Sequence, residues 1–165
     1  PVLIKRGFGI TLDESLNAAE YLASEGNTRV VFGLRGMKTN AGDPHRNFVD
    51  FSHVPVVKRL TRMPVCIDPS HSVGSRESGP EGILDVFHVT AQGVIAGANM
   101  ILVDFHPNPK KALVDGPQAL LVEELPYFLE HVRTAREAYE KCRALAQGFR
   151  DRQAARSSAP QLLAV

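Results

Sequence analysis

Four short apolar runs recur along the chain, and each ends in a charged or polar cluster. The runs are residues 2–4, 30–32, 65–67 and 100–103. Continuous apolar runs of this length are typical of strands buried on both faces of a parallel sheet. The clusters recur about every 30 to 36 positions, which is the length of one strand–loop–helix–loop unit. The pattern therefore predicts an α/β fold built from parallel β/α units.

The clusters that follow the runs carry the candidate chemistry. In a β/α barrel, the loops after the strands open on one face, so side chains at successive strand ends converge on one pocket. We therefore expect Lys5, Arg35, His71 and Asp104 at the carboxyl ends of four neighbouring strands, in sequence order. Four units are half of an eight-stranded (β/α)8 TIM barrel, which needs roughly 250 residues. Because Pro1 directly precedes a strand, we expect residues 1–149 to form the later half of such a barrel.

Helical periodicity fills the segments between the runs. It predicts a helix over residues 11–24, where Thr11 and Glu14 have the spacing of a capping box. It also predicts a short helix over 55–60, a helix over about 83–96 and a long amphipathic helix over 122–146. Three loops are expected: a pocket-facing loop at 37–53, a mobile Ser- and Gly-rich loop at 72–82, and a loop at 107–117. From about residue 150 the composition predicts a solvated or disordered tail, residues 150–165.

Composition narrows the functional classes. The chain is 44% hydrophobic and 22% charged, which is ordinary globular composition, and its net charge is +1. No broad basic face favours nucleic acid or an anionic membrane as a partner. The two cysteines offer neither a disulfide framework nor a C-x-x-C metal pair. Cysteine usage of this kind fits a reducing cytosol, so a cytoplasmic protein is expected, and no apolar stretch is long enough to span a bilayer.

Two cations follow the first two apolar runs. A cation at the end of a buried strand is costly unless an anion pairs with it. A salt bridge from Lys5 to a neighbouring carboxylate is one explanation, and a bound anionic ligand is the other. Arg35 repeats the arrangement one unit later, and neither cation has an acidic neighbour in the sequence. This favours a bound phosphate or carboxylate, which Gly36 would let the backbone approach closely.

A metal-capable set follows the last two runs. A lone histidine such as His71 is more often structural than a ligand, but Asp104 follows one unit later and Asp115 lies in the next loop. One imidazole with two carboxylates suits a divalent cation such as Mn, Fe, Co or Zn.

Several of these segments together resemble a known family. They are Pro-Val-Leu-Ile-Lys-Arg-Gly at residues 1–7, Leu-Arg-Gly at 34–36, Pro-Val-Cys-Ile-Asp-Pro-Ser-His-Ser at 64–72 and the segment 104–118. In order and spacing, residues 1–132 resemble the second half of the barrel of type I 3-deoxy-D-arabino-heptulosonate 7-phosphate (DAHP) synthases. The resemblance implies a metal-dependent condensation of phosphoenolpyruvate with erythrose 4-phosphate, the first step of the shikimate pathway to aromatic amino acids. In that reaction C3 of phosphoenolpyruvate attacks the aldehyde, water adds at C2, and phosphate leaves by carbon–oxygen cleavage.

The resemblance also implies residue roles. Lys5 and Arg35 are expected to bind phosphoenolpyruvate, with His71 also in contact with it. His71, Asp104 and Asp115 are expected to bind the divalent metal. Lys5 and His71 are the expected catalytic residues.

Other parts of the family site lie outside this chain. In the family, a cysteine on the first barrel strand completes the metal site, and a Lys-Pro-Arg-Thr segment holds the aldose phosphate. Neither Cys66, inside a strand run, nor Cys142, on a late helix, is a suitable replacement for that cysteine. Four units alone would leave open sheet edges, so we expect a homo-oligomer or a need for the missing half.

Three departures from the family pattern stand out. Asp104 replaces the usual Glu, which shortens that ligand by one methylene. The loop 72–82 is longer than the family form, which leaves the role of Arg76 open, and Leu34 stands where Glu is common.

Two alternatives remain open from the sequence. The sister enzyme 3-deoxy-D-manno-octulosonate 8-phosphate synthase, which uses arabinose 5-phosphate, shares the fold and metal site. The Ser before His71, and Gln118, favour the heptulosonate enzyme. The second alternative is a non-catalytic half-barrel that serves as a binding or assembly module.

Overall fold

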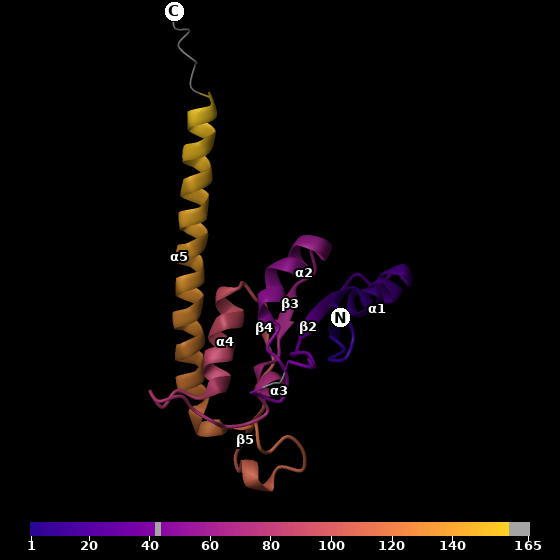
Figure 1. The fold of residues 1–165 in the computed structure, drawn as a ribbon, viewed down its shortest axis with the longest axis vertical. Helices are drawn as coiled ribbons and strands as arrows, with labels where there is room; N and C mark the ends of the chain where they lie inside the picture. Colours follow the sequence, from indigo (N-terminus) through magenta and orange to yellow (C-terminus); the bar gives the residue numbers. More distant parts are fainter. Residues whose placement is uncertain (42–43, 159–165) are drawn as a thin grey trace, which may run out of the picture.

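The chain folds around a parallel sheet, and one long helix extends well beyond it (Figure 1). The computed structural model describes residues 1–41 and 44–158. The strands are β1 (Val2–Lys5), β2 (Val30–Leu34), β3 (Val65–Ile67), β4 (Met100–Ile101), β5 (Phe105–His106) and β6 (Leu120–Leu121). The α-helices are α1 (Leu12–Ser24), α2 (Val54–Thr61), α3 (Pro69–Val73), α4 (Asp85–Ile95) and α5 (Leu125–Ser158). Short 3-10 turns are η1 (Phe51–His53), η2 (Pro109–Lys111) and η3 (Val122–Glu124).

The first four strands lie side by side in the order of the sequence. β1, β2, β3 and β4 form one sheet, and all three pairings are parallel. A second, two-stranded sheet pairs β5 with β6, also in parallel. The prediction of neighbouring parallel strands in chain order is confirmed. Their carboxyl ends consequently share one edge, where the expected functional side chains follow.

The two central strands, β2 and β3, are buried because helices cover the sheet, whereas β1 is only partly buried and Met100 of β4 is exposed, so burial on both faces is not observed for all four apolar runs. Every residue of β3 is buried, as are four of the five residues of β2, including Leu34. One core cluster joins these strands to η1, α2 and α4; its largest members are Phe32, Leu34, Phe51 and Ile67. A second cluster, Val86, Phe87, Leu120 and Phe128, joins α4 and α5 to β6. Strands buried in this way need no polar alternation, which explains their continuous apolar sequence.

The first helix begins where its capping box predicts. The Thr11 hydroxyl accepts a hydrogen bond from the Glu14 backbone N–H, and the Glu14 carboxylate accepts one from the Thr11 backbone N–H. These two bonds satisfy donors that the first helical turn leaves unpaired. The predicted helices over 55–60 and 83–96 are present as α2 and α4, with boundaries shifted by one or two residues.

Two expected irregular segments are more regular than the sequence predicts. The 72–82 segment begins inside α3, and an antiparallel bridge between Ser78 and Leu84 closes its far end. At the carboxyl end, α5 continues through residues 150–158, where a disordered tail was expected. Gln147 contributes to this continuation, because its side chain bonds Asp151 and Arg150 along the helix. Residues 159–165 of the expected tail lie outside the described residues.

Within residues 1–41 and 44–158, no helix combines the length and the apolar character needed to cross a membrane.

Candidate functional site

Asp68 organises the carboxyl end of β3. It caps α3, where its Oδ1 accepts from the His71 backbone N–H at 3.1 Å. The same oxygen lies 2.9 Å from the His71 Nδ1, and Oδ2 lies 2.8 Å from the Lys5 Nζ. Because a carboxylate only accepts, Nδ1 must carry a proton, and in the neutral ring the lone pair is then on Nε2. Asp68 thus links the cation of β1 to the imidazole and fixes the tautomer of that imidazole.

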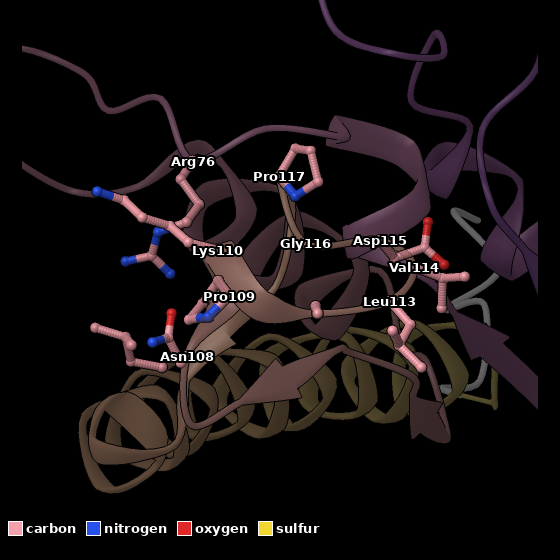
Figure 2. A pocket seen from close by; sticks show the side chains of 11 residues that line it. Arg76, Asn108, Pro109, Lys110, Leu113, Val114, Asp115, Gly116 and Pro117 are labelled. Atoms are coloured by element: carbon pink, nitrogen blue, oxygen red, sulfur yellow. The ribbon is translucent and has the colours of Figure 1, made fainter.

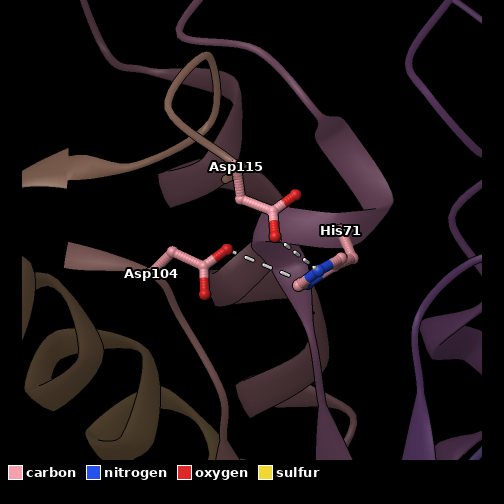
Figure 3. Close-up of side chains that lie close together, drawn as sticks. All are labelled: His71, Asp104 and Asp115. Atoms are coloured by element: carbon pink, nitrogen blue, oxygen red, sulfur yellow. Dashed lines mark ion pairs between the residues drawn. The ribbon is translucent and has the colours of Figure 1, made fainter. Parts of the chain in front are cut away.

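Three metal-capable side chains meet beside this histidine (Figure 3). The His71 Nε2 lies 3.7 Å from an Asp115 oxygen, and the His71 Nδ1 lies 3.9 Å from an Asp104 oxygen. One donor atom from each of the three residues lies within 4.8 Å of the others, and all three side chains are partly exposed. The convergence expected from the sequence is therefore observed, with α3, the segment after β4 and the loop before β6 each supplying one residue.

The geometry of this group fits a divalent cation. Donors bound at 2.0 to 2.2 Å from one ion stand about 3 to 3.6 Å apart, so small side-chain rotations would bring these atoms into range. The imidazole already has the tautomer that a ligand needs, since Asp68 holds Nδ1 and leaves Nε2 available. His106, two residues after Asp104, lies outside the group, and its Nδ1 accepts a hydrogen bond from the Asn108 backbone.

Both aspartates are themselves held by hydrogen-bonding or charged neighbours. The Asp104 Oδ2 accepts from the Gln118 amide at 2.8 Å, and the Asp104 backbone N–H donates to the Ser70 hydroxyl at 3.0 Å. The Asp115 Oδ1 lies 3.5 Å from the Arg46 guanidinium. The carboxylates are therefore oriented before any ligand arrives.

The two expected anion-binding cations differ in their surroundings. Lys5 is ion-paired with Asp68, so the salt bridge that the sequence left open as one explanation is present: the carboxylate follows a strand two positions along the sheet. Arg35 forms no ion pair with any residue that the structure describes, and its buried Nε has no hydrogen-bond partner there. Its guanidinium lies 5.8 Å from the centre of the Phe8 ring. Arg35 thus keeps donor capacity that an external anion could use.

Arg6 and Gly36 have structural rather than ligand-facing environments. Arg6 forms a fully buried salt bridge with Asp50 at 2.8 Å. The other oxygen of Asp50 accepts from the Gly36 backbone N–H at 2.9 Å. A side chain on Gly36, whose φ is +79°, would collide with the Asn47 Cβ. The glycine therefore admits the 46–48 segment, and the expected close approach to a ligand is replaced by this packing.

An open pocket of about 650 Å³ adjoins Asp115 (Figure 2). The 108–117 loop supplies most of its wall, and Arg76 and Lys110 line one end of it. Arg76 is already engaged, because it donates two hydrogen bonds to Glu124 and one to the Ala119 carbonyl. This pairing lowers the pKa of Glu124 and raises that of Arg76. The role of Arg76 left open by the sequence is thus to tie the 72–82 segment to the start of α5.

The cysteines do not join the metal-capable group. Burial raises the pKa of Cys66 to about 11, and the nearby Asp68 carboxylate adds to the rise. Cys66 is therefore a neutral thiol inside β3 at ordinary pH, whereas a metal ligand must be a thiolate. Cys142 is exposed on α5.

Sequence reasoning missed three residues that shape this site. Asp68 had a usable signal, since an Asp directly before Pro at a helix start predicts an N-cap, and the third helical residue is His71. Gln118 was used in the sequence only to favour the heptulosonate enzyme over its sister, and not as a residue that holds Asp104. Arg46 carried no signal, because the 37–53 segment has no helical or strand period, and its backbone pairing with residues 72–73 is long-range.

Fold and site together define a class of protein. Consecutive parallel β/α units that gather ionisable side chains at the strand ends are the arrangement of β/α-barrel enzymes. The DAHP synthetase I family model matches residues 1–141, and the chain belongs to this family. The resemblance drawn from the sequence is confirmed.

Individual relatives agree with this assignment. The chain is 37% identical to the phospho-2-dehydro-3-deoxyheptonate aldolase of Thermotoga maritima over 84% of its own length and 38% of that protein. A crystal structure of the Thermotoga maritima phospho-2-dehydro-3-deoxyheptonate aldolase (DAHP synthase) superposes with a TM-score of 0.75, at 37% identity and with the same coverage of both chains. A 2-dehydro-3-deoxyphosphooctonate aldolase of Acidithiobacillus ferrooxidans is 32% identical over 80% of this chain and 48% of that protein. The chain thus spans about half or less of the length of these relatives.

Proposed function

We propose that this chain is the later half of a DAHP synthase barrel, and that it supplies the metal-binding and phosphoenolpyruvate-binding side of the active site. The observation that carries the proposal is the convergence of His71, Asp104 and Asp115 on the sheet edge that also bears Lys5 and Arg35. Family membership and the higher identity to the heptonate relative than to the octonate relative support this reaction over the sister one.

In this proposal, His71, Asp104 and Asp115 hold a divalent cation such as Mn, Fe, Co or Zn. The cation would supply Lewis-acid polarisation of the aldehyde oxygen of erythrose 4-phosphate. Asp68 accepts from the His71 Nδ1, so the neutral ring has its lone pair on Nε2, which lies 3.7 Å from an Asp115 oxygen. Asp104 and Asp115 contribute negative charge and hard oxygen donors.

Lys5 and Arg35 bind the anionic groups of phosphoenolpyruvate in this proposal. Arg35 offers a planar fork of donors suited to a phosphate or carboxylate, and its unpartnered Nε supports that role. The Lys5 ammonium has three donors, of which Asp68 occupies one. Two cations on adjacent strands fix the orientation of the nucleophile, which lowers the entropic cost of bringing it to the aldehyde.

The remaining requirements come from outside this chain. The aldose phosphate site and a further metal ligand belong to the other half of the barrel, so the isolated chain is proposed to be inactive. The outer edges of β1 and β4 pair with no other strand among the residues that the structure describes, which favours association, either with that half or with further copies. A cytoplasmic enzyme that works as a homo-oligomer is the form we propose for the complete protein.

The decisive experiment supplies the missing half. The 165-residue chain is expressed alone and together with a fragment that carries the family's cysteine-bearing first strand and its Lys-Pro-Arg-Thr segment. Each preparation receives Mn²⁺, phosphoenolpyruvate and either erythrose 4-phosphate or arabinose 5-phosphate, and phosphate release is followed alongside sedimentation. We expect turnover with erythrose 4-phosphate only in the combined preparation.

Other results would redirect the proposal. Turnover with arabinose 5-phosphate alone would establish the sister reaction. A combined preparation that assembles but releases no phosphate with either aldose would favour a non-catalytic module. Near-family turnover by the isolated, monomeric chain would refute the division of the site between two halves.

A further inference from the structure

A buried glutamine lies between an arginine and one of the metal-capable aspartates. Gln118 is 2% exposed, and both ends of its amide are used. Its Oε1 accepts from the Arg46 guanidinium at 3.0 Å, and its Nε2 donates to the Asp104 Oδ2 at 2.8 Å. The contacts span 72 and 14 positions of sequence, so only the folded chain assembles them.

The chemistry of the neighbours fixes the orientation of this amide. An arginine can only donate hydrogen bonds, and a carboxylate can only accept them. The amide oxygen must therefore face Arg46, and the amide nitrogen must face Asp104. The flipped orientation would set two donors against each other and two acceptors against each other. Arg46 thus determines the direction in which Gln118 holds the aspartate.

Arg46 is itself anchored to the segment that carries the histidine. Its backbone N–H donates at 2.8 Å to the carbonyl of Val73, the last residue of α3, and α3 also carries His71. Its side-chain stem packs over Gly74, whose φ of +77° and missing side chain leave room for it. The guanidinium also lies 3.5 Å from the Asp115 Oδ1. One arginine is therefore tied to all three arms of the metal-capable group.

Gln118 and Asp115 belong to one turn. The Gln118 backbone N–H donates to the Asp115 carbonyl at 3.3 Å, and Asp115 has a positive φ of 54°, which is uncommon for a residue other than glycine. The turn therefore presents one metal-capable carboxylate and, three residues later, the amide that holds the other.

We infer that Gln118, oriented by Arg46, is a positioning residue that sets the direction of the Asp104 carboxylate for metal binding. The amide donates to Oδ2 of Asp104, the oxygen that lies 3.9 Å from the His71 Nδ1, and so holds the carboxylate with this oxygen turned toward the histidine. Asp104 is one methylene shorter than the glutamate usual in the family, so its reach depends more strongly on such a hold. The inference rests on the proposed metal site and assigns it a support that neither the family match nor the motif specifies.

The test measures metal affinity rather than turnover. Mn²⁺ binding to the full chain is followed by electron paramagnetic resonance, and Co²⁺ binding by its visible absorption, which reports coordination geometry. Gln118→Met keeps the side-chain volume and removes both hydrogen bonds. We expect about tenfold weaker Mn²⁺ binding, in the range typical for loss of a group that orients a ligand, and an altered Co²⁺ spectrum.

A matched control comes from α5. Gln147→Met removes another amide that donates to a carboxylate, that of Asp151, on the exposed surface of the helix. This variant should bind both metals as the unmodified chain does. Circular dichroism and the melting temperature show whether the buried Gln118→Met variant still folds.

A second variant tests the hydrogen-bonded series Arg46–Gln118–Asp104 at Arg46, its exposed end. Arg46→Lys keeps the charge of a side chain that is 47% exposed but loses the planar fork, so it should weaken Mn²⁺ binding about threefold. Since Arg46→Lys keeps a cation near Asp115 and loses only the fork that orients Gln118, adding it to Gln118→Met should weaken binding no further. Arg46→Lys also keeps the inference testable if Gln118→Met fails to fold.

The outcomes separate this inference from the proposed function. If the unmodified chain binds neither metal, the proposed metal site fails and the positioning role fails with it. If His71→Ala abolishes binding while Gln118→Met and Arg46→Lys leave affinity and spectrum unchanged, only the positioning role is overturned. Fully additive losses in the double variant would refute the role of this hydrogen-bonded series, because Arg46 would then act independently of Gln118.

Discussion

The candidate site has a carboxylate side, with His71, Asp104 and Asp115, and a cation side, with Arg35, and the two sides differ in how many of their polar groups have partners within the chain. On the carboxylate side, Asp104 is bonded to Gln118, Asp115 faces Arg46, and the ring of His71 is held by Asp68. On the cation side, Arg35 has a buried Nε without a partner among the described residues. The first side is organised in advance by its own neighbours, whereas the second keeps donors available. This difference agrees with the proposal of a metal site beside a site for an anionic substrate.

Lys5 connects the two sides. Its ammonium stands at the end of β1 beside Arg35, yet its ion pair is with Asp68, which also orients the His71 ring. A substitution at Lys5 should consequently affect both sides, and one at Arg35 only its own. Substitutions on each side test this division.

Removing the His71 imidazole should produce the largest difference between the effects on Mn²⁺ affinity and on phosphoenolpyruvate affinity. His71→Ala deletes one of three donors, so Mn²⁺ affinity should fall about 100-fold or more, since even indirect supports of a ligand contribute 10- to 100-fold. Phosphoenolpyruvate affinity should fall much less. Titration calorimetry with each ligand measures both effects. His106→Ala, a nearby histidine outside the group, is the control, and equal Mn²⁺ affinity in both variants would remove His71 from the site.

The cation side is tested with phosphoenolpyruvate. Arg35→Met should weaken its binding about 10- to 100-fold, the effect of losing hydrogen bonds to a charged group, and should leave Mn²⁺ affinity unchanged. Lys5→Met should weaken phosphoenolpyruvate binding to a similar degree and also lower Mn²⁺ affinity a few-fold, because Asp68 loses its cation. Calorimetry in the absence and presence of Mn²⁺ measures both quantities. If Arg35→Met and Lys5→Met give the same Mn²⁺ affinity, Lys5 does not couple the two sides.

The shortened carboxylate is the next test of the organised side. Asp104→Asn removes a negative donor and should lower Mn²⁺ affinity about tenfold. Asp104→Glu restores the usual family length and should keep or raise that affinity. Calorimetry of the three proteins under identical buffer conditions decides the point. Equal affinity in all three would mean that Asp104 is no ligand.

The smallest expected effect lies outside both sides, at the Arg76–Glu124 pair. Hydrogen bonds from Arg76 lower the pKa of Glu124 from its ordinary value of 4.5. The pair therefore stabilises the fold fully at pH values above this ordinary pKa, and the stabilisation is lost as the pH falls through the lowered pKa. Glu124→Gln should therefore cost about 0.5 to 1 kcal/mol at pH 7 and little at the acidic end. Urea unfolding at several pH values measures this difference. If the two proteins differ in unfolding free energy by the same amount at every pH, the ion pair contributes nothing. The Mn²⁺ affinity of Glu124→Gln should equal that of the unmodified chain.

The sequence alone determined the parallel β/α architecture and the residues at the strand ends. Apolar runs such as 65–67 are buried on both faces, so their pattern is a direct consequence of their environment. The sequence also predicted the capping box of α1 and the convergence of His71, Asp104 and Asp115, because local hydrogen bonds and repeated strands produce regular sequence spacings.

Only the tertiary structure decided the partners of those residues. Lys5 meets Asp68 because β3 lies two strands away in the sheet, and Arg46 reaches Gln118 because its irregular segment pairs with the end of α3. Neither contact leaves a periodic trace, since each joins positions far apart in the chain. The continuation of α5 through residue 158 was missed for a different reason: a polar, Ala- and Arg-rich composition suits both a solvated tail and an exposed helix, and side-chain pairs one turn apart favour the helix.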